Sequence, residues 1–340
     1  MGRAGIRAVT MVGAIAMVVL AGCSSESTPD VLQTIEPAAP AAAPEVGPSP
    51  AGDVRPLDLQ VDALVVEPST GTFAALVDDG ARLALFDDTT FDGPGTEPRL
   101  VDLPSSAATV VTGPEGSVLA PVSGAVLRID VADGTITEVP VDGNAASAAV
   151  LSDGRWAVGT DNGRVLVVDP GSGEVATTIG GLASVDALAV TGDAVAALDR
   201  RQTSLTELDL ADAHLGPALR AGEGATQLTT DPFGRVVVTD TTGDELLVYT
   251  LDAIVLRQRY PVGPAPYAVT YDETRDLIWV TLTGSNEVVG YDLSTGIPRE
   301  RHRFATVRQP NSIAVDPADA ALVIASATGD GLQRIPIEGQ

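Results

Sequence analysis

The sequence is poor in the residues that usually carry metal, redox and covalent chemistry. It has one cysteine, Cys23, and two histidines, His214 and His302, and all 20 of its basic residues are Arg. A single cysteine excludes an intramolecular disulfide, so the fold must be held by packing alone. Serine-hydrolase, phosphate-loop, Cys/His metal and haem-attachment motifs are all missing from the sequence. A motif-based enzyme class is therefore not indicated.

Long helices and large aromatic side chains are also scarce. Aromatic residues make up 4% of the chain, and no segment after residue 23 keeps a helical hydrophobic period. The 35 glycines and 24 prolines suit a chain with many tight turns. We expect an all-β fold whose sheets are filled by small aliphatic side chains.

Negative charge is what the chain has in excess. The net charge is −26, and removal of Arg3 and Arg7 with an export signal would leave about −28. Such a surface repels nucleic acid and anionic lipid headgroups and attracts cations or basic protein surfaces. Solubility of an exported protein is the simpler explanation of the charge.

One stretch, 266–303, contains a complete structural unit. Runs rich in β-branched and aromatic residues at 267–271, 277–282, 288–292 and 299–304 are separated by Gly, Asn, Asp or Ser corners. This is the signature of four short antiparallel strands in one meander sheet. A single sheet of this size cannot bury both its faces, so it needs neighbours.

The unit recurs along the chain. The residue that ends its first strand falls at Val66, Val111, Val150, Val190, Thr230, Tyr271 and Val315, at intervals of 45, 39, 40, 40, 41 and 44. Intervals near 40 residues are typical of propeller blades. Many of the strands are apolar at consecutive positions, which indicates sheets buried on both faces. The pattern predicts seven four-stranded blades.

Residues 264–297 resemble the YVTN-type β-propeller repeat nearly from end to end. The resemblance is carried by Ile278-Trp279-Val280-Thr281, Ser285-Asn286, Val288-Val289-Gly290-Tyr291-Asp292 and Ser294-Thr295-Gly296. As an architecture it covers roughly 54–340, which would make residues 54–340 a seven-bladed β-propeller. The Trp-Asp and Gly-His signatures of another propeller class are absent. The resemblance implies a fold, because propellers host many unrelated activities.

Residues 54–61 form an orphan strand before the first unit, and the last unit has only three clear strands, at 311–315, 322–327 and 332–337. The simplest interpretation pairs 55–61 into the last blade as its outer strand. Such pairing closes the ring and removes exposed sheet edges.

The N-terminus matches a lipoprotein export signal. Arg3 and Arg7 precede an apolar stretch at 8–20, and Leu20-Ala21-Gly22-Cys23 matches a lipobox. The apolar stretch is shorter than the roughly 20 residues that span a membrane. Resemblance to bacterial lipoproteins, including those of the actinobacterial type, implies a signal peptide at 1–22 and a diacylglycerol (palmitate-type) anchor on Cys23. A plain secretory signal with an incidental cysteine is the alternative.

Residues 23–53 then form a lipidated cysteine followed by a Pro/Ala-rich tether. Proline at this density opposes helix and sheet and favours extended chain, so 30 residues could reach up to roughly 90 Å. We expect the tether to be a spacer that holds the propeller clear of the lipid surface. The predicted localisation is the extracytoplasmic face of the cell membrane.

Acidic residues follow the second strand of several units. They are Asp78, with its neighbour Asp79, Asp161, Asp199 and Asp240, and the equivalents in other units are Ser123, Thr283 and Thr328. In a propeller these corners share one face around the channel, where their oxygens could bind Ca²⁺ or another hard cation. Ordinary turn chemistry explains the same aspartates without a cofactor, and no cofactor is the simpler expectation.

Two functions remain open. The first is a monomeric, membrane-anchored binding or scaffold module for a protein, peptide or glycan of the cell envelope, with no nucleic-acid partner. The second is a lactonase-like propeller hydrolase that uses a divalent metal at the channel mouth. The scarcity of histidine and the absence of a metal-ligand pattern favour the binding module over an enzyme, and no catalytic residue is assigned.

Overall fold

The computed structural model describes residues 1–2, 32–45, 47–86 and 97–337. Residues 3–22 of the predicted signal peptide, Cys23 and residues 24–31 of the predicted tether lie outside the described residues. Among the residues described, no helix is long and apolar enough to span a bilayer. Gln33–Gln340 form one compact unit, and Met1–Leu32 are assigned to a separate one.

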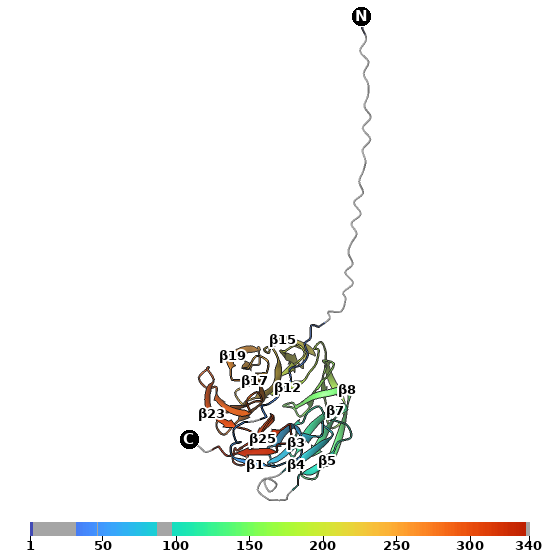
Figure 1. The fold of residues 1–340 in the computed structure, drawn as a ribbon. Helices are drawn as coiled ribbons and strands as arrows, with labels where there is room; N and C mark the ends of the chain where they lie inside the picture. Colours follow the sequence, from blue (N-terminus) through green and yellow to red (C-terminus); the bar gives the residue numbers. More distant parts are fainter. Residues whose placement is uncertain (3–31, 46, 87–96, 338–340) are drawn as a thin grey trace. The chain divides into compact units, whose positions relative to one another are not determined.

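The compact unit is an all-β propeller of antiparallel sheets arranged in a ring (Figure 1). Within the four-stranded sheets the strand order follows the sequence, as in a meander, except that the N-terminal β1 is the outer strand of the last sheet. Sheet I contains β2 (Val61–Glu67), β3 (Thr72–Val77), β4 (Arg82–Phe86) and β5 (Arg99–Asp102). Sheet III contains β12 (Ala187–Thr191), β13 (Ala194–Asp199), β14 (Ser204–Asp209) and β15 (His214–Arg220).

Three more sheets complete the second half of the ring. Sheet IV contains β16 (Ala225–Thr230), β17 (Arg235–Asp240), β18 (Glu245–Thr250) and β19 (Val255–Pro261). Sheet V contains β20 (Pro266–Asp272), β21 (Leu277–Leu282), β22 (Glu287–Asp292) and β23 (Arg299–Ala305). Sheet VI contains β24 (Pro310–Val315), β25 (Leu322–Ser326), β26 (Leu332–Ile335) and β1 (Asp53–Arg55).

The prediction of seven separate blades is wrong for the second and third units, because the described residues form six hydrogen-bonded sheets. Sheet II has six strands: β6 (Val111–Thr112), β7 (Ser117–Asp130), β8 (Ile136–Val150), β9 (Trp156–Thr160), β10 (Val165–Val168) and β11 (Val175–Ile179). Strands β7 and β8 are long and run through positions where the sequence pattern predicts corners. β8 pairs with β7 through its first half and with β9 through its second half.

Sheet II bends back on itself. Gly124 and Gly143 have positive φ angles of 83° and 103°. The pairing register shifts beside them, between Ser123 and Ala125 in the β7–β8 ladder and between Ala145 and Ser147 in the β8–β9 ladder. The bend packs Leu119, Val126 and Val139 of one half against Trp156 and Val158 of the other. The two halves therefore bury their faces against each other as neighbouring sheets would.

Burial shows why the sheets form a ring. The apolar core divides into clusters between sheets VI and I, I and II, II and III, III and IV, IV and V, and V and VI, besides the one inside sheet II. Every sheet thus packs against two neighbours. This arrangement explains the consecutive apolar residues of the central strands, which are buried on both faces.

The ring closes through sheet VI. Strand β1 pairs antiparallel with β26, which confirms an N-terminal outer strand but corrects its position. The strand is Asp53–Arg55 and not 55–61, because Val61 already belongs to the inner strand of sheet I. Three residues are enough to cover the exposed edge of β26.

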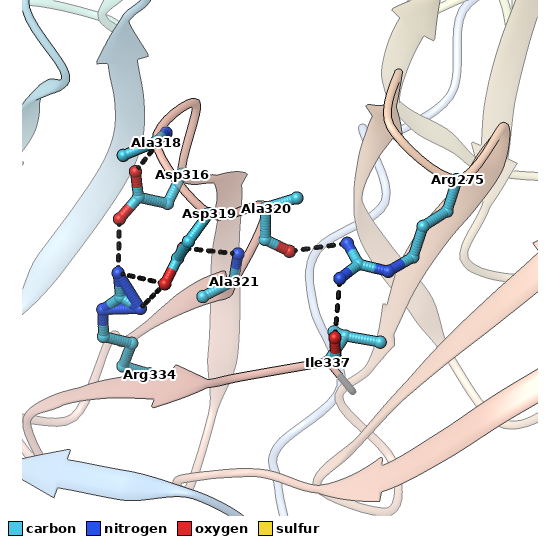
Figure 2. Close-up of polar contacts among 8 residues, drawn as sticks. All are labelled: Arg275, Asp316, Ala318, Asp319, Ala320, Ala321, Arg334 and Ile337. Atoms are coloured by element: carbon cyan, nitrogen blue, oxygen red, sulfur yellow. Dashed lines mark hydrogen bonds and ion pairs between the residues drawn. The ribbon is translucent and has the colours of Figure 1, made fainter. Parts of the chain in front are cut away.

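Polar contacts reinforce the packing between sheets V and VI (Figure 2). Arg275, in the β20–β21 hairpin, donates to the carbonyl oxygens of Ala320 at 2.8 Å and Ile337 at 2.7 Å. Its guanidinium also lies 3.1 Å from the buried carboxylate of Asp272. Within sheet VI, Arg334 bridges Asp316 at 2.7 Å and Asp319 at 3.0 Å. Arg275 thus connects one sheet to the next by main-chain acceptors.

Candidate binding face at the channel mouth

The strand directions bring two kinds of loop to one face of the ring. Because consecutive strands are antiparallel, the corner after the second strand of a sheet meets the linker that leads into its first strand. Hydrogen bonds show this meeting directly: Thr241 N donates to Gly224 O and Thr283 N donates to Ala265 O. We call this face, with the corners and linkers around the central channel, the mouth.

Asp199 and Asp240, two of the predicted metal ligands, lie at the mouth but are fully buried. The carboxylate of Asp199 accepts hydrogen bonds from the backbone N–H groups of Ala183, Ser184 and Gln202. Asp240 accepts from the N–H groups of Glu223, Gly224 and Gly243, all within 3.0 Å. Both carboxylates tie a corner to the adjacent linker, which is the chemistry expected of a turn aspartate.

Asp78 and Asp161, the other two candidates, make local contacts in their own sheets. Asp78 has a positive φ of 56° and pairs with Arg82. Asp161 accepts a 3.0 Å hydrogen bond from Asn144 Nδ2. Among the described residues, no three of these four aspartates lie close enough together to hold one metal ion. A cation at the mouth stays a prediction.

The corner positions without an aspartate are also engaged. Ser123 bonds to Asn144 at 2.6 Å, Thr283 donates to Ala265 O at 3.1 Å, and Thr328 donates to Asp330 at 2.6 Å. The hydroxyl groups at these corners therefore fix loop geometry in the same way as the aspartates do.

Beneath the mouth, the inner strands of all six sheets line a channel cavity of about 580 Å³. Its wall is mixed, with Asp62, Asp186 and Arg200 among aliphatic residues. Burial raises the pKa of Asp62, and the nearby charges of Asp79 and Asp78 act in the same direction. Ser312, also in this wall, is 5% exposed, and its hydroxyl has no hydrogen-bond partner among the described residues.

Part of the segment predicted as a tether lies on the mouth. The N–H of Ile35 donates to Arg201 O at 2.8 Å, and the guanidinium of Arg200 donates to Ala38 O. Farther along, Gln309 Nε2 donates to Ala41 O at 3.0 Å, and Asn286 Nδ2 donates to Pro44 O at 3.0 Å. Arg200 lies in the β13–β14 corner of sheet III, Asn286 in the β21–β22 corner of sheet V, and Gln309 just before sheet VI. Residues 35–44 therefore connect three sheets.

The side chains that hold the segment are themselves positioned. Arg200 N donates to Asp186 Oδ2 at 2.7 Å, and Gln309 N donates to Asn286 Oδ1 at 3.0 Å. Gln309 and Asn286 both have positive φ angles, 52° and 54°, a conformation that costs energy for glutamine in particular. The sequence did not predict this role for the three residues, because their partners are distant in sequence. Asn286 was noted only as part of the repeat motif Ser285-Asn286.

A different cluster stands at the β14–β15 hairpin. Asp209, Asp212 and His214 offer ligand atoms within 4.8 Å of one another, beside a pocket of about 530 Å³. Asp209 already accepts hydrogen bonds from the N–H groups of Ala211 and Asp212. The second histidine, His302, stacks on Trp279 with ring centroids 5.6 Å apart. The two histidines therefore lie in different sheets and serve no common site.

Comparison with known proteins identifies the fold and no closer relationship. No family model and no curated protein matches the sequence. Among solved structures, the chain is similar to Kuenenia stuttgartiensis hydrazine synthase, with TM-score 0.69, 13% identity, and 87% of this chain and 99% of that chain covered. It is also similar to a streptogramin B lyase, with TM-score 0.68, 11% identity, and 84% and 96% covered.

A chain of a mitotic checkpoint complex is a third similar structure, with TM-score 0.71, 12% identity, and 91% and 98% covered. These neighbours carry unrelated titles on one architecture, and at such identities the likeness shows the fold alone.

Proposed function

We propose that this protein is a lipid-anchored, extracytoplasmic binding module whose channel mouth receives a polypeptide of the cell envelope. The observation that carries the proposal is the bound state of residues 35–44. Three side chains from different sheets hold this stretch by its backbone carbonyl groups, so the mouth has donors arranged for an extended chain.

The lipid anchor in this proposal rests on sequence. The lipobox and the short apolar stretch before it support lipidation of Cys23 after cleavage of residues 1–22. Two or three acyl chains would anchor the protein stably where one would not. A Cys23→Ser variant should move from the membrane fraction to the soluble extracytoplasmic fraction, and equal membrane retention would contradict the anchor.

The proposal also includes a repeat of the YVTN type. Sheet II would then be one enlarged blade of six, with halves joined through β7 and β8 that pack against each other. The near-constant interval of about 40 residues through this region supports the repeat.

Site-directed photocrosslinking in native membranes tests the binding function. A photoreactive residue at Gln202, in a mouth corner, should give an adduct with an envelope protein that mass spectrometry can identify. The matched position is Ser152, which lies in the β8–β9 hairpin on the other face. Adducts from Gln202 and not from Ser152 would support the mouth as the binding face. Equal adducts, or none from Gln202, would contradict it.

A further inference from the structure

The contacts to the segment 35–44 recur every third residue. The carbonyl groups that accept side-chain hydrogen bonds belong to Ala38, Ala41 and Pro44. A polyproline II helix has three residues per turn, so carbonyl groups spaced by three point to the same side. The three donors of the mouth thus follow one edge of such a helix.

The burial of residues 36–43 has the same period. Residues 36, 39 and 42 are exposed, whereas 37, 38, 40 and 41 are half-buried and Ala43 is buried. Pro44 and Glu45 are both exposed, so the burial period ends at Ala43. An extended strand would alternate every second residue. The hydrogen bonds over 38–44 and the burial over 36–43 therefore both indicate a threefold helix with one edge in solvent.

The surface that receives the segment is shaped for small and cyclic side chains. Prolines at 37, 40 and 44 restrict the chain to extended conformers before it binds, which lowers the entropy lost on binding. Gly224 leaves room for Ala38, because a Cβ atom at this glycine would lie 2.8 Å from that of Ala38. The side-chain donors of the mouth bond to main-chain carbonyl oxygens of the segment. Recognition therefore depends on backbone shape and on small side chains.

The mouth holds the segment by few contacts. Ile35 is 47% exposed, and Pro44 is exposed as well. Among the described residues, side chains of the mouth hold the segment by four hydrogen bonds, two of them made by the amide group of Gln309. Attachment to the same chain compensates for this, since a short linker gives an effective concentration near the millimolar range. A free proline-rich chain of better fit can therefore displace the segment.

We propose that the mouth is a receptor for proline-rich segments in the polyproline II conformation, and that residues 35–44 occupy it in cis until such a segment of an envelope protein displaces them. This inference rests on the proposed binding function and names its ligand class and its regulation. Displacement would also lengthen the free tether by the residues released.

The test uses the full chain in detergent and a labelled synthetic peptide of residues 33–46, with binding followed by fluorescence anisotropy. In one variant a Gly/Ser sequence of equal length replaces residues 35–44. This variant should bind the peptide saturably, and the native chain at least tenfold more weakly, because its own segment competes. Gln309→Ala in the replaced chain should weaken binding at least tenfold, whereas Gln258→Ala, a glutamine of the outer strand β19, should not.

A second peptide, with glycine at the three proline positions, separates backbone shape from composition. It should bind at least tenfold more weakly than the native peptide. Absence of peptide binding by a replaced chain that melts at the native temperature would overturn the proposal, and so would equal binding of both peptides. Photocrosslinks from the mouth without peptide binding would contradict only the proline-rich ligand class. The proposed binding function would then still be supported.

Proteolysis gives a readout that does not depend on the replaced chain. In the otherwise native protein, Asn286→Ala/Gln309→Ala removes two of the donors that hold the segment. A glutamate-specific protease should then cut after Glu45 at least five times faster than in the native chain. Equal cleavage rates would mean that the segment is not held at the mouth, and the proposal would fail.

Discussion

At the residue scale, buried carboxylates explain how a chain so acidic folds. Four acidic residues at the ends of inner strands are at most 7% exposed: Glu67, Asp231, Asp272 and Asp316. Each is satisfied by hairpin N–H groups or by an arginine. Part of the negative charge is thus internal and structural, in addition to any role in solubility.

The two buried tryptophans provide a matched test of this chemistry. Trp279 Nε1 donates to Asp272 at 3.2 Å, whereas Trp156 Nε1 is buried without a partner among the described residues. The reason is local, because Leu151 stands after the inner strand where sheet V has Asp272. Trp279→Phe should therefore destabilise the fold by about 1 kcal/mol more than Trp156→Phe. Urea unfolding of both variants measures this difference, and an equal loss would contradict it.

Glu67 predicts the response to acid. Burial acts to raise the pKa of its carboxyl, but hydrogen bonds from Ser69, Thr70 and Gly116 outweigh burial and lower it. A lowered folded pKa contributes stability that is present above the unfolded pKa and is lost as pH falls through the folded value. Stability should therefore drop below about pH 5, and less steeply in Glu67→Gln. Unfolding titrations from pH 7 to pH 3 check this, and identical slopes would refute it.

At the scale of the elements, the unit pattern was predictable and its junctions were not. The interval of about 40 residues placed the inner strands correctly, since corner residues and buried apolar runs alternate along the chain. The sequence did not show that β7 and β8 are long uninterrupted strands, because Gly124 and Gly143 look like turn residues yet lie within these bent strands. The position of β1 was missed because only its pairing with β26 distinguishes it.

Closure by β1 depends on close approach at glycine. A Cβ atom at Gly331 would lie 2.2 Å from Arg55 O, whereas one at Gly329 would meet nothing within 4 Å, and both residues have positive φ. Both alanine variants would be destabilised by backbone strain, but only in Gly331→Ala would the new Cβ atom also clash with β1. We expect it to destabilise the protein by about 2 kcal/mol more than Gly329→Ala. Equal melting temperatures of the two variants would show that β1 does not close the ring.

The contact between sheets V and VI depends on one arginine. Arg275→Ala would remove hydrogen bonds to Ala320 and Ile337 and leave the buried Asp272 without its guanidinium partner. A cost of about 3 kcal/mol is expected, because an unpaired buried charge is left. Arg257→Ala, which loses one exposed bond to Thr250, should cost about 0.5 kcal/mol or less. Denaturant midpoints compare the two, and similar values would contradict the account.

At the scale of the whole molecule, the sequence predicted the mouth as a face and offered a cation site on it, but it did not predict the contacts that hold residues 35–44. Its corners could be placed from the sequence, and Asp199 and Asp240 do lie there. The residues that hold the segment could not be identified, since the contacts of Arg200, Asn286 and Gln309 span 162, 242 and up to 268 residues. Composition indicated only that residues 35–44 are extended. Which surface an extended chain contacts is a property of the folded ring.

This placement changes the expected geometry of the proposed anchor. If residues 35–44 stay on the mouth, the free tether shortens to residues 24–34, which reach about 34 Å at most in polyproline II conformation. The mouth would then face the membrane surface from which the segment arrives. Release of the segment would restore the longer reach predicted for the whole tether.

The most direct test of the account is a distance measurement between spin labels at Ala39→Cys and Gln202→Cys, in a Cys23→Ser background. The account predicts one narrow distance distribution, because the segment is held at the corner that contains residue 202. Asn286→Ala/Gln309→Ala should broaden the distribution. A broad distribution in the native sequence, unchanged by this double substitution, would show that residues 35–44 are a free tether and would contradict the central claim.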